Sequence, residues 1–125
     1  MERYLWIAAG AVLGANARYL VAQWAAERLG AAFPFGTLIV NLTGSFVLGF
    51  VLSLTTERFA VSPAMRLFLA VGFLGSYTTF SSYTVESLGL LQNGAPASGL
   101  LNILGNNVAG LICALLGVYL ARQLA

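Results

Sequence analysis

Hydroxyl side chains gather at one place in the chain where a lipid-facing sequence would carry Leu, Val and Ile. Residues 75–84 read GSYTTFSSYT, with eight hydroxyl side chains in ten positions, inside an apolar segment at 65–91. Ser, Thr, Tyr and Gly are mediocre helix formers, so this stretch predicts a helix that is broken near its middle. At membrane depth a broken backbone is tolerated only where it is buried in protein or lines a water-filled cavity. The alternative is that the hydroxyls bond to the preceding turn or join neighbouring helices, but a run of eight favours a functional polar stretch.

A few other polar side chains lie inside the apolar segments: Arg18, Asn41, Glu86, Asn102 and Asn106. Most of them donate hydrogen bonds or carry positive charge. A proton-coupled cation exporter needs a carboxylate at membrane depth, and Glu86 lies only near the far end of its segment. Donors without carboxylates are typical of a path for anions.

The composition indicates a membrane protein and argues against an enzyme. The chain is 59% hydrophobic and 8% charged, lacks Lys, Asp and His, and has a mean hydropathy of +0.86. Six Arg and four Glu cannot cover the surface of a soluble domain of 125 residues. The sequence offers no nucleophile motif, paired carboxylates or set of metal-binding side chains, and the single Cys113 is interpreted as a small core residue. A surplus of two positive charges does not indicate nucleic acid.

Four apolar segments are long enough to span a hydrocarbon core, which takes about 20 helical residues. They cover residues 5–26, 36–54, 65–91 and 100–121, and the loops between them are short. Short loops require antiparallel neighbours, so we predict an all-α membrane protein in which residues 1–125 form a single four-helix transmembrane domain. Both termini are then on the same side.

The arginines give only a weak signal for orientation. Those on the side of the termini are Arg3, Arg58, Arg66 and Arg122, whereas the other side has Arg28 and, deeper in its helix, Arg18. Positive-inside reasoning places the termini in the cytoplasm by a small margin. A chain this short encloses little volume, so a transport path calls for a second copy, and a two-fold dimer is the commonest solution. The weak bias permits the two copies to insert in opposite directions.

Three stretches combine glycines and polar residues with apolar ones: residues 10–19 (GAVLGANARY), 35–46 (FGTLIVNLTGSF) and 72–86 (GFLGSYTTFSSYTVE). Together they resemble the signatures of the Fluc (CrcB-like) fluoride channels. The likeness extends over the whole chain and its four-segment layout, and the second and third stretches are the specific ones.

The resemblance implies a passive, fluoride-selective channel that exports fluoride across the inner (plasma) membrane and lowers its cytoplasmic concentration. It implies an antiparallel, dual-topology homodimer, one subunit inverted in the bilayer relative to the other, with two pores. It also implies a structural sodium ion at the dimer centre, held by backbone carbonyls that correspond here to Gly75 and Thr78.

The resemblance also assigns residues to the fluoride path. Asn41 matches the pore-lining asparagine, Phe80 the first of two pore phenylalanines, and Arg18 a vestibule arginine. Thr79, Ser82 and, near a pore mouth, Glu86 belong to the same signature. The chain departs from the family in two respects: Tyr83 stands where the second phenylalanine is expected, and Asn102 and Asn106 replace a track of hydroxyls on the last helix.

General physical chemistry is consistent with these roles. Fluoride is small and strongly hydrated, so a pore must replace its water with donors such as amide N–H and hydroxyl groups. Aromatic ring edges carry positive potential and can face an anion. Each residue also has a plainer interpretation: Arg18 snorkelling to the interface, Asn41 joining helices, Phe80 packing in a core, Glu86 as a solvated helix-end charge.

Two other functions remain open from the sequence. A small multidrug-resistance-type exporter is also a short four-helix chain that can insert both ways, but it needs a glutamate inside the first helix, where this chain has Gly10, Gly14 and Arg18. A structural membrane subunit without transport would leave the hydroxyl stretch without a purpose.

Overall fold

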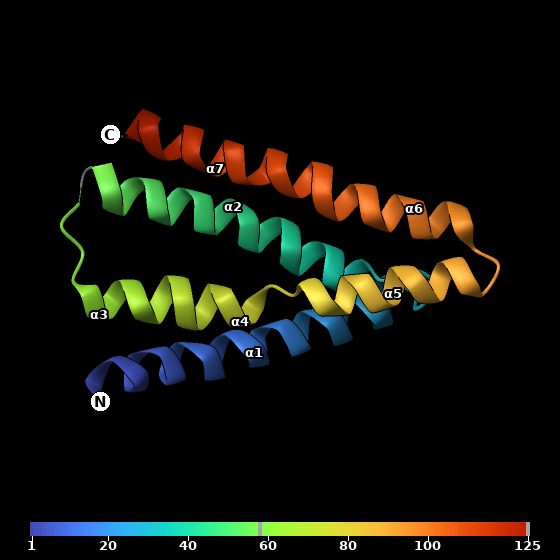
Figure 1. Ribbon diagram of the computed structural model, residues 1–125, viewed down its shortest axis with the longest axis horizontal. Helices are drawn as coiled ribbons and strands as arrows, with labels where there is room; N and C mark the ends of the chain where they lie inside the picture. The colour runs from blue at the N-terminus through green and yellow to red at the C-terminus, as the bar shows by residue number, and fades with distance from the viewer. Residues whose placement is uncertain (58, 125) are drawn as a thin grey trace.

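The computed structural model of the protein describes residues 1–57 and 59–124, and in this part of the chain all regular structure is helical (Figure 1). The elements form four membrane segments. The first is α1 (Glu2–Leu29) and the second is α2 (Phe35–Glu57). The third contains α3 (Pro63–Arg66), the π-helical η1 (Leu67–Leu74), α4 (Gly75–Tyr77) and α5 (Phe80–Gln92). The fourth contains α6 (Pro96–Leu104), the π-helical η2 (Gly105–Ala109) and α7 (Gly110–Leu124).

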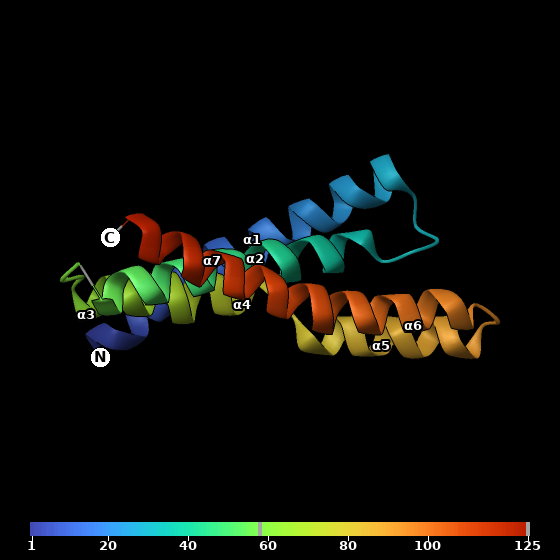
Figure 2. The ribbon, with the colours of Figure 1, turned by 90° about the horizontal axis from the view of Figure 1, so that it is seen from above.

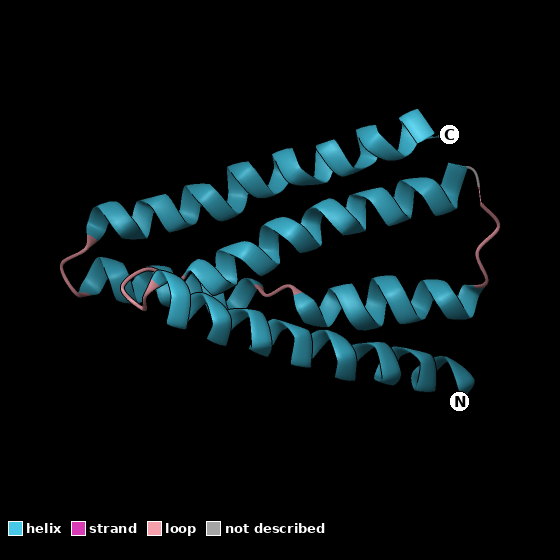
Figure 3. Cartoon of the chain, turned by 180° about the vertical axis from the view of Figure 1, so that it is seen from behind, coloured by secondary structure: helices cyan, strands magenta, loops and turns pink. Residues whose placement is uncertain are grey.

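The predicted four-helix, all-α arrangement is confirmed, and both termini lie at the same end of the bundle (Figure 1). The third segment is interrupted at Thr78 and Thr79, which are drawn as a loop between two helical halves (Figure 3). Arg58, which the orientation argument counts on the side of the termini, lies outside the described residues.

Local sequence signals set the ends of the segments. Gly30 ends α1 with φ at 89°, a conformation that side chains other than glycine rarely adopt. Ser62 caps α3, since its hydroxyl accepts a hydrogen bond from the Met65 amide, and Pro63 occupies the first turn. Pro96 likewise opens α6. The turns are therefore short and keep consecutive segments antiparallel.

Glycines let the backbones of neighbouring segments touch. A Cβ added at Gly10 or Gly14 of α1 would overlap the main chain of Phe73 in the third segment. In the same way, a Cβ at Gly117 of α7 would overlap the main chain of Phe46 in α2. Close approach of this kind favours helix association in lipid, where van der Waals packing takes the place of the hydrophobic effect as a driving force.

The outer surface of the bundle is apolar. Large side chains such as Leu111 and Leu115 are mostly exposed, and the buried hydrophobic core of the described residues contains only Ala25, Val40, Leu74 and Ala121. By length and hydropathy, α1, α2 and the continuous fourth segment Pro96–Leu124 can each cross a membrane. The break divides the third segment into two halves that are each shorter than a span, so these must cross together.

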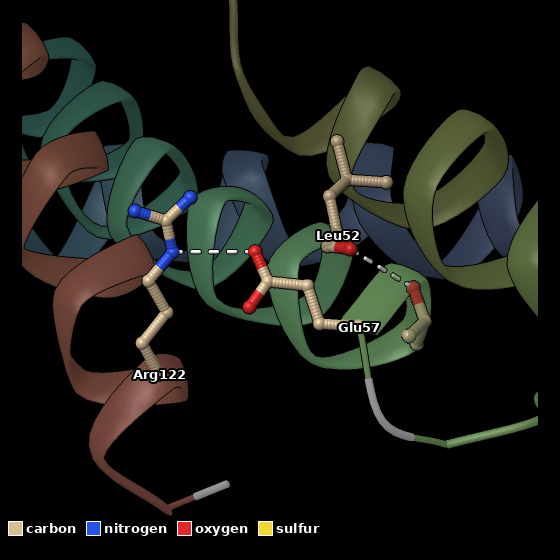
Figure 4. Close-up of polar contacts among 4 residues, drawn as sticks. Leu52, Glu57 and Arg122 are labelled. Carbon is tan, nitrogen blue, oxygen red and sulfur yellow. Dashed lines mark hydrogen bonds and ion pairs between the residues drawn. The ribbon is translucent and has the colours of Figure 1, made fainter.

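The two ends of the bundle differ. At the end that holds the termini, Arg122 of α7 forms an ion pair with Glu57 of α2, with 3.2 Å between Nε and Oε1 (Figure 4). Both side chains are exposed, so the pair contributes at most about 1 kcal/mol. At the opposite end the last turns of α1 and the first turns of α2 diverge from α5 and α6 (Figure 2).

Candidate functional site

The break in the third segment is two residues long. Thr78 (φ −85°, ψ 158°) and Thr79 (φ −150°, ψ 122°) are extended, while the Thr78 amide still donates to the Leu74 carbonyl as in a helix. Thr79 then begins α5 as its N-cap, because its hydroxyl oxygen accepts from the Ser82 amide at 3.2 Å. The hydroxyl residues of the sequence therefore both interrupt one helix and start the next.

The side chain of Asn41 in α2 binds the main chain of the interrupted segment at Thr79. Its Oδ1 accepts from the Thr79 amide at 2.8 Å, and its Nδ2 donates to the Thr79 carbonyl at 2.9 Å. One side-chain amide thus satisfies both polar main-chain groups of a residue that has left the helix. This matters at membrane depth, where an unpaired main-chain group is costly.

The same bonds release two main-chain carbonyls. In a continuous α-helix the amides of Thr79 and Ser82 would donate to the carbonyls of Gly75 and Thr78. Here the first amide donates to Asn41 and the second to the Thr79 hydroxyl. Carbonyl oxygens are ligands for hard cations, so Gly75 and Thr78 are residues that could hold one. The described residues contain no cluster of three His, Cys, Asp or Glu side chains that would do so.

A one-way series of hydrogen bonds connects the break to the fourth segment. Nδ2 of Asn41 also donates to Oδ1 of Asn106 at 2.7 Å, and Nδ2 of Asn106 donates to Oδ1 of Asn102 at 3.0 Å. Nδ2 of Asn102 donates to the Ser87 hydroxyl at 2.8 Å, and that hydroxyl donates to the Tyr83 carbonyl. Asn102 is fully buried. These amide N–H groups are therefore engaged with protein acceptors.

A cavity of about 240 Å³, which we call the break cavity, lies beside the interruption. Its lining brings together Asn41, Thr78, Thr79, Phe80, Tyr83 and Asn106, together with Gly44, Ser45, Leu48 and Asn107. Phe80 is 74% exposed. Its ring meets Tyr83 edge to face, with ring centroids 5.1 Å apart and an interplanar angle of 80°.

A second cavity, also about 240 Å³ and here called the arginine cavity, shares Thr79 with the first. Arg18, Thr37, Ser82 and Glu86 line it. Nε of Arg18 donates to the Ser76 carbonyl at 3.1 Å, so the guanidinium lies at the level of the break instead of reaching to the membrane surface.

Glu86 stands between the arginine cavity and a larger one of about 440 Å³ at the diverging end of the bundle, the mouth cavity. Both cavities are lined by Thr37 and Glu86, and the Thr37 hydroxyl donates to Oε1 of Glu86 at 2.8 Å. The buried Oε2 has no hydrogen-bond partner among the described residues. The three cavities thus adjoin in order, from the mouth past Glu86 to Arg18, and past Thr79 to the aromatic pair.

Residues 5–118 match the family described as CrcB-like protein, Camphor Resistance (CrcB). The chain belongs to the CrcB-like family. Three curated relatives, each named fluoride-specific ion channel FluC, are similar to it over nearly the full length of both chains. The protein of Koribacter versatilis is 45% identical (99% of this chain, 98% of the relative), that of Sulfurihydrogenibium sp. 47% (99% and 100%), and that of Rhizobium meliloti 41% (99% and 99%). The predicted family is confirmed, and the names of these CrcB-like relatives denote channels, not enzymes.

Some residues of this CrcB-like site were missed by the sequence analysis. Thr37 holds Glu86, Ser87 ends the series of amide bonds, and Asn107 donates to the Tyr83 hydroxyl at 3.1 Å. Helical spacing carries a signal for two of them. Thr37 precedes Asn41 by one turn, and Ser87 follows Tyr83 by one turn, so each shares a face with a residue that the sequence singled out.

We expect Asn41→Asp to destabilise the fold around the interruption at Thr78 and Thr79. The carboxylate keeps the bond from the Thr79 amide but cannot donate to the Thr79 carbonyl or to Asn106. Each acceptor left without its donor costs about 1–3 kcal/mol, so thermal unfolding in detergent, followed by circular dichroism, should begin at a clearly lower temperature. The matched control is Gln123→Glu, the same amide-to-carboxylate change on an exposed residue near the end of α7. Equal melting of Asn41→Asp and the parent protein would show that the side chain does not hold the break.

Proposed function

We propose that this chain forms a passive, fluoride-selective channel that exports fluoride down its gradient and so lowers the fluoride concentration in the cytoplasm. One observation carries the proposal beyond the names of the relatives. Three adjoining cavities run from the diverging end of the bundle to the helix break, and polar groups line them at membrane depth. Such groups in a membrane segment indicate a path for ions.

Arg18 is the strongest attraction for an anion along this path. Its Nε is held by the Ser76 carbonyl, while its other guanidinium nitrogens have no hydrogen-bond partner among the described residues. Arg18 and Glu86 line the same cavity without an ion pair between them in the described part of the chain. The positive charge therefore stays available to an anion that has lost part of its water, while Thr37 holds one oxygen of Glu86 aside.

The aromatic pair provides the next contact. An aromatic ring is positive at its edge, and a strongly exposed Phe80 presents its ring at the break cavity. Ring edges do not form strong bonds, which suits conduction because an ion must also leave.

The alternative of a multidrug-type exporter has less support. Such a protein needs a glutamate inside its first helix, whereas α1 has Gly10 and Gly14 there, in backbone contact with the third segment. The polar residue on that face is the cationic Arg18.

Phe80→Leu tests the channel function. The substitution keeps an apolar side chain on an exposed position, so the fold should be unaffected, but it removes the ring edge. We expect fluoride efflux from proteoliposomes, measured with a fluoride electrode at matched protein density, to fall at least about tenfold. Phe59→Leu, which changes another exposed phenylalanine in the loop before α3, is the control and should conduct as the parent does. A parent protein without fluoride efflux would reject the function, and normal efflux in Phe80→Leu would reject the role of the ring.

We infer that two copies assemble in opposite orientations, each contributing a path. One copy leaves polar groups on its outer surface at the depth of the break, among them exposed Gly75 and the exposed hydrogen bond between Thr43 and Tyr77. Lipid offers these groups no partner, whereas a second copy does. Inversion is compatible with the few arginines that distinguish the two ends.

Labelling of the C-terminus tests the inverted pair. In a Cys113→Ala background, a single cysteine in a C-terminal tag should react with a membrane-impermeant maleimide in intact cells to about half of its total amount. Permeabilising the cells should then expose the other half. A cytoplasmic protein with a reactive cysteine serves as the control for cell integrity. Reaction from one face only would exclude the inverted arrangement.

We further propose that the carbonyls of Gly75 and Thr78 from both copies hold a sodium ion at the dimer centre. The support is that the bonds of Asn41 and Thr79 leave these carbonyls without their helical donors. Bound there, the ion would supply a fixed positive charge and join the two breaks.

Sodium dependence of the assembly tests this site. The parent protein should melt at a higher temperature, and remain dimeric at lower concentration, in sodium than in N-methylglucamine at equal ionic strength. Gly75→Val should abolish this difference. The first carbon that it adds lies at an ordinary contact distance within the subunit, 3.6 Å from the Ala70 carbonyl oxygen, so this atom leaves the fold of the subunit undisturbed. A parent protein that behaves identically in both cations would exclude the sodium site.

A further inference from the structure

Asn107 and Tyr83 form a pair beside the break that lies outside the series of amide bonds described above. Nδ2 of Asn107 lies 3.1 Å from the Tyr83 hydroxyl oxygen and 2.8 Å from the carbonyl oxygen of Ile103, one turn earlier in the helix. Both side chains line the break cavity. The edge-to-face contact with Phe80 fixes the same tyrosine ring from another side.

The Ile103 carbonyl sets the direction of the hydrogen bond to the tyrosine. A carbonyl oxygen only accepts, so the amide group of Asn107 must turn its nitrogen, and not its oxygen, toward Ile103. That same nitrogen is the atom next to the tyrosine, and an amide nitrogen only donates. The Tyr83 hydroxyl therefore accepts from Asn107, and its own proton points elsewhere.

The proton has no acceptor among the described residues, and Tyr83 lines the break cavity. The other side chains there are mostly engaged. Both N–H groups of Asn41 are taken by Thr79 and Asn106, and the hydroxyls of Thr78 and Thr79 donate to Leu74 and Ser82. Within the described structure, the side-chain donors that remain for a guest in this cavity are the hydroxyls of Tyr83 and Ser45.

We propose that Asn107 is a positioning residue that makes the Tyr83 hydroxyl a donor to an anion in the break cavity. This inference rests on the proposed fluoride channel function and deepens it. Accepting a hydrogen bond polarises a hydroxyl and strengthens its own donation. The donor favours a small anion of high charge density, and it holds that anion longer, because conduction requires the ion to break each contact.

The first test is a double-mutant cycle on the concentration dependence of fluoride efflux from proteoliposomes. Tyr83→Phe should raise the half-saturating fluoride concentration by roughly 2- to 10-fold, the loss of one hydrogen bond, and should raise the maximal rate. Asn107→Leu, which keeps the Tyr83 hydroxyl but removes the hydrogen bond to it along with the one to Ile103, should shift both values in the same direction by less. In the double variant Asn107→Leu should add nothing to Tyr83→Phe.

The second test observes the hydroxyl itself. In protein labelled with ¹³C at the tyrosine Cζ atoms and reconstituted in lipid, the resonance that is missing in Tyr83→Phe belongs to Tyr83. Adding fluoride should shift this resonance in solid-state NMR spectra, an equal concentration of chloride should not, and Asn107→Leu should reduce the shift. Asn16→Leu is the matched control, because Asn16 is also exposed and also bonds to the carbonyl one turn earlier, that of Val12, but makes no hydrogen bond to a tyrosine among the described residues.

The outcomes separate this inference from the channel function. A parent protein without fluoride efflux rejects the function. A parent that conducts, with unchanged half-saturation in Tyr83→Phe and no fluoride-dependent shift of the Tyr83 resonance, rejects the tyrosine donor alone. If Asn107→Leu has the same effect in the Tyr83→Phe background as in the parent protein, Asn107 acts independently of the hydroxyl, and its positioning role is rejected.

Discussion

The pairing of Asn41 with the main chain of Thr79 is the interaction on which the rest of the site depends. A helix cannot simply stop inside a bilayer, because its main-chain groups find no water there. One side-chain amide from α2 takes up both the amide and the carbonyl of the residue that leaves the helix. Because Asn41 makes these two hydrogen bonds, the third segment can expose carbonyls and hydroxyls at membrane depth without leaving the main chain of Thr79 unpaired.

The pairing of Asn41 with Thr79 also determines which hydrogen-bond donors are free to contact an ion. Because Asn41, Asn106 and Asn102 direct their N–H groups into a series of protein acceptors, they hold the segments together and do not offer free donors. The groups left over are of a different kind: the guanidinium of Arg18, hydroxyls and ring edges. In the proposed path these groups stand beside asparagines whose N–H groups are already engaged, and contacts that an ion can break again suit conduction.

The sequence predicts the framework of this structure better than its contacts. Long apolar segments and short loops are enough for four antiparallel helices, and a run of hydroxyls is enough for a break near its observed place. What the sequence lacks is the partner of each polar group, since a partner is chosen across segments. Asn41 reads as a donor for an anion, and only the fold shows both of its N–H groups engaged. Asn107 carries no signal of its own, because its role depends on where the Tyr83 ring lies.

The glycines that pack helices together and the polar residues at the break lie on the same helix faces. Gly10, Gly14 and Arg18 are spaced by one turn on α1 and therefore share one helix face. The two glycines contact the main chain of the third segment, and the guanidinium of Arg18 lies beside the break in that segment. On α2, Thr37, Asn41 and Gly44 form a similar stripe, in which the last residue packs closely against Thr78. A shift of either helix by one residue would remove a tight contact and a polar bond together. The glycines therefore fix not only how closely the helices approach but also which polar groups meet at the break.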